Sequence, residues 1–109
     1  MKDMAIAIAW TFEFDNGYVY VHDDVLLFKE MDLFVAQMLN SDIAAQGSTL
    51  EECLNRLRTT LGAQMSINLE AGKSALANLP SAPKKYFERA RKARFFTVKM
   101  SSDSAEPLN

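Results

Sequence analysis

The chain has 109 residues, of which 49% are hydrophobic and 24% are charged, with one cysteine and a formal net charge of −2. This composition predicts one folded domain and excludes disorder over most of the length, and a single cysteine excludes an internal disulfide. No run approaches the roughly 20 apolar residues of a membrane span, and the N-terminus does not resemble a secretory signal, so we expect a cytoplasmic protein.

Charge is distributed unevenly along the chain. Residues 1–83 hold five Lys and Arg against eleven Asp and Glu, whereas residues 84–94 hold six cations and a single acid. The positive charge is thus concentrated in one short segment of an otherwise acidic chain.

Alternating large and small side chains predict that the chain opens with a β-hairpin. From Met4 to Phe14 every second residue is large and apolar, which is the period of a half-buried strand. Asp15-Asn16-Gly17 suits a tight turn, and residues 18–21 form the returning strand. His22-Asp23-Asp24 then interrupts the apolar pattern, and we expect a turn there.

Two nearly continuous apolar runs, 25–30 and 33–39, predict further strands about a turn at Met31-Asp32. A buried helix also fits runs this short. A small strand over 43–46 ends at Gly47, where the chain must reverse sharply. We expect Gly47 to adopt a backbone conformation that is closed to most other residues.

The clearest predicted helix covers residues 49–70. Ser48-Thr49-Leu50-Glu51 has the spacing of a capping box, and apolar residues then recur three and four apart, interrupted only at Gln64. Gly72 is placed to supply the left-handed C-terminal cap.

Prolines separate this helix from a shorter basic one. Leu79-Pro80-Ser81-Ala82-Pro83 must be extended, and Pro83 suits the first position of a helix that runs to Ala93. Aromatic and β-branched residues predict a last strand over 94–100, and residues 101–109 form a polar tail that we expect to be mobile.

These elements predict an α+β fold in one domain, residues 1–100. An antiparallel sheet of about four to six strands carries the long helix 49–70 on one face, with the shorter basic helix before the last strand.

The stretch from Phe34 to Leu54 resembles the HicB-like antitoxin family. It combines a strand ending in Val35-Ala36-Gln37, a turn, a small strand, and Gly47-Ser48-Thr49 leading into an amphipathic helix with the acidic pair Glu51-Glu52. The similarity covers roughly residues 25–90. It implies a partial ribonuclease-H-like sheet without nuclease residues, in a stand-alone member that has no DNA-binding domain.

What the resemblance implies about function is protein binding. Members of the family sequester a small RNA-cleaving toxin, HicA, so we expect this chain to inhibit a partner protein such as a HicA-like toxin. The family's operator-binding domain has no counterpart after Ala93.

Two groups of carboxylates could carry chemistry, although each has a simpler explanation. His22-Asp23-Asp24 contains the groups that hold a divalent cation or move protons, but Asp is also favoured at turns for its local hydrogen bonds. A two-metal nuclease needs several converging carboxylates. The candidates for such a site all lie in or beside predicted turns: Asp15, Glu30, Asp32 and Asp42.

Cys53 lies on the apolar stripe of the long helix, with no base near it in sequence, and we expect it to pack as a small hydrophobe. We therefore predict no catalytic residue, no metal site and no cofactor, and a protein that is not an enzyme. A degenerate or genuine nuclease is the least supported reading.

The basic segment 84–94 carries the predicted binding site. Its cations, interleaved with Tyr86 and Phe87, can contact an acidic protein, can bind the phosphates and bases of a nucleic acid, or can be a solvated helix face. We also expect a homodimer, formed at the sheet edge that strand 94–100 leaves exposed. The predicted partner-binding residues are Lys84, Lys85, Arg89, Arg91 and Lys92.

Overall fold

The computed structural model describes residues 5–14 and 19–101, with residues 94–101 described for their backbone alone. The elements along the chain are β1 (Ile6–Phe14), β2 (Val19–Glu30), β3 (Leu33–Met38), β4 (Ala44–Gly47), α1 (Leu50–Glu70), α2 (Lys84–Lys92) and β5 (Arg94–Ser101). The turn predicted at Asp15-Asn16-Gly17 and residues 102–109 of the predicted tail lie outside the described residues, whereas Ser101, predicted as part of the tail, is the last residue of β5.

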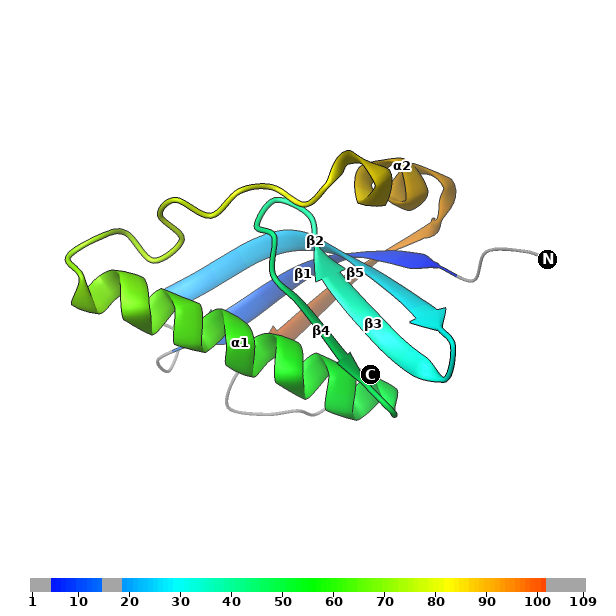
Figure 1. Ribbon diagram of the computed structural model, residues 1–109, viewed down its shortest axis with the longest axis horizontal. Helices are drawn as coiled ribbons and strands as arrows, with labels where there is room; N and C mark the ends of the chain where they lie inside the picture. The colour runs from blue at the N-terminus through cyan, green and yellow to red at the C-terminus, as the bar shows by residue number, and fades with distance from the viewer. Residues whose placement is uncertain (1–4, 15–18, 102–109) are drawn as a thin grey trace.

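The strands form one sheet in the order β4-β3-β2-β1-β5, and the predicted α+β fold is confirmed (Figure 1). Neighbouring strands from β4 to β1 are antiparallel, whereas β5 runs parallel to β1. The parallel pair arises because the chain passes through α1 and α2 before it returns to the sheet, which is the kind of long crossover that parallel strands require.

The two helices cover opposite faces of the sheet. Along β2, Val25 belongs to the apolar cluster that contains Leu57 of α1, whereas its neighbour Leu26 belongs to the cluster that contacts Phe87 of α2. Successive side chains of a strand point to opposite faces, so the continuous apolar run in β2 reflects burial on both sides.

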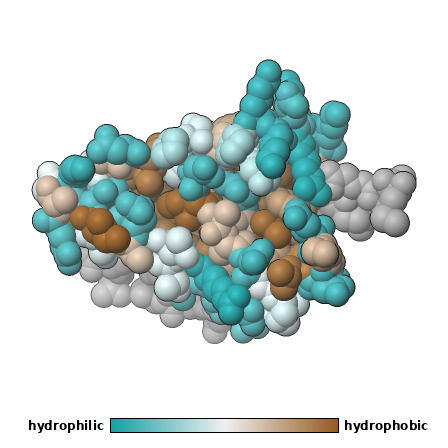
Figure 2. All heavy atoms as spheres, viewed as in Figure 1, coloured by the Kyte–Doolittle hydropathy of each residue, from teal (hydrophilic) through white to brown (hydrophobic). Residues whose placement is uncertain are grey.

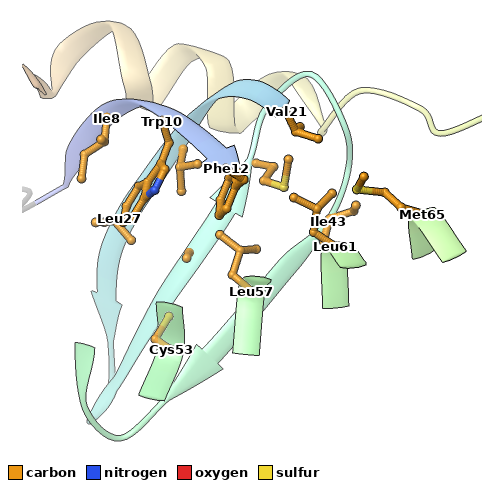
Figure 3. Packing of buried hydrophobic residues seen from close by; sticks show 13 residues of the cluster. Ile8, Trp10, Phe12, Val21, Leu27, Ile43, Cys53, Leu57, Leu61 and Met65 are labelled. Carbon is orange, nitrogen blue, oxygen red and sulfur yellow. The ribbon is translucent and has the colours of Figure 1, made fainter. Parts of the chain in front are cut away.

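The larger cluster lies between α1 and the aromatic residues of β1 (Figure 3). The rings of Trp10 and Phe12 are stacked with centroids 5.7 Å apart. Helix α1 faces them with a stripe at intervals of three and four residues, as expected for one side of a helix. Its buried residues are Cys53, Leu57, Leu61, Met65 and Asn68.

Both ends of α1 are capped as the sequence predicts, with a shift of one residue at the start. Thr49 Oγ1 accepts a hydrogen bond from Glu52 N at 3.1 Å, and Glu52 Oε1 accepts one from Ser48 N at 3.3 Å. Gly72 has a left-handed φ of 75°. Neither described helix is long and apolar enough to cross a membrane.

The predicted turn at His22-Asp23-Asp24 is wrong, because these residues lie in the middle of the long strand β2. They pair with β1 in continuous register, Thr11 opposite His22 and Trp10 opposite Asp23. Asp has a low preference for strands, but tertiary hydrogen bonds to its carboxylate outweigh that preference here.

Gly47 is required for a different reason from the one predicted. It is absent from the described residues with positive φ, among which Gly72 is the only glycine. A Cβ atom at Gly47 would lie 2.7 Å from Cys53 N, because the end of β4 crosses the first turn of α1 closely. The requirement is steric and comes from packing.

We expect Gly47→Ala to lower the free energy of unfolding by more than about 1 kcal/mol, since the backbone of α1 must move to admit the new methyl group. Gly62→Ala is the matched control. Its Cβ would lie 3.5 Å from Phe14 Cε1, an ordinary contact, and helix propensity predicts a gain of about 1 kcal/mol. Urea unfolding of both variants measures the difference, and an unchanged Gly47→Ala protein would contradict the close approach.

Met31 in the turn between β2 and β3 has φ 58° and a side chain that is 93% exposed. A left-handed residue with a Cβ costs about 1 kcal/mol, and an exposed side chain loses little burial on removal. Met31→Gly should therefore raise the free energy of unfolding by about 0.5–1 kcal/mol. Thermal unfolding measures the gain, and Asp32→Gly, at a position without positive φ, should show none.

Candidate functional site

The predicted partner-binding residues lie on α2, whose apolar side contacts the sheet. Tyr86, Phe87 and Ala90 pack against a cluster that includes Leu26 and Phe28 of β2. Residues three and four apart share one side of a helix, so this anchoring directs most of the cations away from the sheet. Figure 2 shows hydrophilic side chains projecting from the surface over α2.

The predicted cations differ in their surroundings. Lys84, Lys85, Arg91 and Lys92 are exposed, whereas Arg89 is half-buried. The Arg89 guanidinium carbon lies 4.1 Å from the centre of the Phe28 ring, which is cation–π geometry. Arg89 therefore helps to hold α2 on the sheet in addition to any contact with a partner.

Local contacts leave the remaining cations accessible. Lys84 Nζ lies 3.8 Å from Glu88 Oε1, and both side chains are largely exposed, so the pair contributes little to stability. The positive segment is thus presented on a fixed helix.

The aromatic rings of α2 are engaged with the protein. The Tyr86 ring stacks on Phe28 with centroids 6.2 Å apart, and Lys85 Nζ lies 5.0 Å from the centre of the Tyr86 ring. Phe87 contacts the same cluster. Stacking of nucleobases needs open ring faces, so α2 offers charge without an open platform for bases.

The carboxylate of Asp23 holds the turn between β3 and β4. Asp23 Oδ1 accepts hydrogen bonds from Asn40 N at 3.0 Å and Asn40 Nδ2 at 2.9 Å, and Oδ2 accepts one from Ser41 N at 3.2 Å. Burial raises the pKa of Asp23, although these hydrogen bonds act in the opposite direction. The period-two sequence Val21, Asp23, Val25 was the signal for an inward-facing Asp.

His22 and Asp23 do not converge on one ion. Asp23 is buried while His22 is exposed, because successive side chains of a strand point to opposite faces. His22 Nδ1 instead lies 2.8 Å from Thr11 Oγ1 on the neighbouring strand. Among the residues that the structure describes, no three His, Cys, Asp or Glu side chains lie close enough to hold a metal ion.

The other carboxylates considered from the sequence lie at opposite ends of β3. Glu30 and Asp32 belong to the β2–β3 hairpin, whereas Asp42 follows the far end of β3. Asp42 Oδ1 accepts a hydrogen bond from Gln37 Nε2 at 2.8 Å. Asp15 lies outside the described residues. The described carboxylates thus do not assemble a two-metal site.

Cys53 packs in the core as predicted. Its side chain is fully buried, and the Sγ atom donates a hydrogen bond to Ala45 O at 3.5 Å. Burial raises the pKa of this thiol, which opposes formation of a nucleophilic thiolate.

The chain was compared with family models, curated protein sequences and solved structures, and none of them matches it.

We expect Asp23→Asn to remove a pH-dependent part of the stability. Since the pKa of Asp23 is raised in the folded protein, the folded state holds this proton more tightly than the unfolded chain does. Its ionisation therefore destabilises the fold. The stability that the protonated carboxyl contributes is fully present below about pH 4, the unfolded pKa, and is lost as the pH rises through the raised folded pKa.

The free energy of unfolding of the wild type minus that of Asp23→Asn should accordingly decrease with rising pH and then level off. Above that window the variant remains less stable by about 1–3 kcal/mol. The amide nitrogen that replaces one carboxylate oxygen cannot accept a hydrogen bond, so one of the two backbone donors of the turn loses its partner. Urea unfolding across the acidic range measures both effects, with the exposed Asp32→Asn as control. A difference that does not change with pH would contradict the assignment.

Proposed function

We propose that the chain is a non-enzymatic protein-interaction module of the HicB-like antitoxin type, which binds and inhibits a partner protein such as a small RNA-cleaving, HicA-like toxin. The observation that carries the proposal is the division of α2 into two sides. Its apolar side is anchored on Leu26 and Phe28, while four of its cations face solvent. A preorganised, charged helix suits stoichiometric binding.

The geometry of the segment that resembles HicB proteins supports the proposal. Residues 34–54 form one continuous unit of β3, turn, β4 and the start of α1. The features that carry the resemblance have structural roles in this unit: Gly47 admits α1, and Thr49 and Glu52 cap it. The unit is a scaffold, which agrees with a role in binding.

Residues that could have served a reaction have structural partners instead. Asp23 holds a turn, His22 contacts Thr11, and Cys53 is buried with a raised pKa. These contacts favour a binding role over turnover.

The sign of the charge on the contact surface of this chain determines which kind of partner surface can bind it. The exposed cations of α2 fit an acidic patch, whereas a toxin with a cationic RNA-binding surface would fit the acidic remainder of the chain. The two modes of contact predict opposite effects of charge reversal on α2.

The test is affinity capture with the full-length chain, followed by reconstitution with the purified partner. We expect a captured ribonuclease that the chain inhibits with a 1:1 endpoint. The double variant Arg91→Glu/Lys92→Glu should weaken binding at least about tenfold if α2 is the contact. Lys73→Glu, which changes an exposed cation in the loop after α1, is the matched control.

Tighter binding of the double variant would place the contact on the acidic remainder, and unchanged binding would place it on the sheet or α1. Metal-dependent cleavage by the chain itself, lost on substitution of one carboxylate, would overturn the non-enzymatic proposal.

Nucleic-acid binding through residues 84–94 is the second candidate, favoured by the exposed lysines and arginines of α2. It predicts binding of a labelled oligonucleotide that weakens steeply as salt rises. The inward position of Tyr86 and Phe87 favours the protein partner over this candidate.

A further inference from the structure

Strand β4 forms one edge of the sheet, and its outer side is unpaired in the described structure. The direction of its backbone groups follows from its pairing with β3. Met38 N donates to Ile43 O at 2.9 Å, and in an antiparallel pair the hydrogen-bonded residues alternate. The C=O of Ile43 and the backbone groups of Ala45 and Gly47 therefore face β3, whereas the N–H and C=O groups of Ala44 and Gln46 face outward.

The sequence of β4 contains no lysine, proline or bulge to protect its outer side, and among the described side chains Arg56 of α1 bonds to one outward group, the Gln46 carbonyl. Protected edges usually carry such features, but β4 reads Ala44-Ala45-Gln46-Gly47, and Ala44 and Gln46 are exposed. The opposite edge, β5, contains Arg94 and Lys99 in its sequence. The β4 edge is thus the better surface for strand addition, in contrast to the predicted dimer edge at β5.

Helix α1 runs beside this edge and forms with it an open groove of about 810 Å³. Arg56 Nη1 donates to Gln46 O at 3.0 Å and also lies 3.2 Å from Glu52 Oε1. The groove is lined by small or polar side chains, among them Ala44, Gln46, Asn55, Arg56 and Thr59.

We propose that the occupant of this groove is a second copy of the chain, whose β4 pairs antiparallel with the first across a two-fold axis at Ala45. This register sets Ala44 of each copy opposite Gln46 of the other. Gln46 N then donates to Ala44 O of the other copy, and Ala44 N donates to Gln46 O, whose second lone pair remains beside the hydrogen bond from Arg56, so that the two sheets join into one.

Charge complementarity favours a copy of the same chain. Arg56 and Glu52 lie one helical turn apart, next to the level of the axis. A two-fold axis there brings Glu52 of each copy towards Arg56 of the other, which gives two equivalent pairs of opposite charge. Since opposite charges meet in both pairs, the groove is complementary to itself.

The first experiment is sedimentation velocity of the full-length chain over a concentration series. The expected species has twice the 12.2 kDa mass of the monomer. Gln46→Pro removes an outward N–H without removing a β3–β4 hydrogen bond, and should raise the dissociation constant of the dimer at least about tenfold. Gln46→Ala and Lys92→Glu, which is on α2, should leave it unchanged.

The second experiment does not depend on how well β4 tolerates proline. Ala44→Cys and Gln46→Cys proteins are mixed and oxidised, and the register predicts a disulfide between the different variants, with little cross-linking of either variant alone. Cys53 is buried and does not compete. A monomer at all concentrations, a dimer unaffected by Gln46→Pro, or cross-linking without preference for the mixture would each overturn the proposal.

Discussion

The turn at residues 39–43 joins several parts of the molecule, and the buried carboxylate of Asp23 holds it against the sheet. On its outer side, Asp42 N donates to Pro80 O at 2.7 Å, and Ala82 N donates to Leu39 O at 2.9 Å. The same turn leads into β4 and hence into α1. The positions of both helices therefore depend on one short segment and on the buried carboxyl group whose hydrogen bonds order it.

Burial on both faces makes the sheet a rigid support for charged surfaces. The α1 side contains the aromatic residues of β1, and the α2 side contains Leu26 and Phe28. Because each helix is attached through an apolar stripe, its polar side is presented in a defined orientation. The cations of α2 and the ion pair on α1 thus lie on different surfaces, so that binding of a partner and self-association need not compete.

The basic segment shows what a pattern of charges can and cannot indicate. Its sequence predicted an exposed cationic helix, and the structure confirms α2 with most of its cations in solvent. The sequence could not separate Arg89 from the others, since its contact with the Phe28 ring depends on how α2 crosses β2. Tyr86 and Phe87, whose rings were the sequence-based reason to consider nucleic-acid binding, face the sheet because of the same packing of α2 on β2.

By itself the sequence determined the α+β class, the α1 stripe with its caps, the hairpins and the basic helix, because these depend on local periodicity and turn chemistry. Tertiary structure decided what depends on distant partners. Hydrogen-bond donors from the β3–β4 turn stabilise Asp23 within a strand. Gly47 does not have a positive φ, and glycine is required there because a Cβ atom would collide with Cys53 N. The free edge of β4 also emerged only from the strand order, since an edge is a property of the whole sheet.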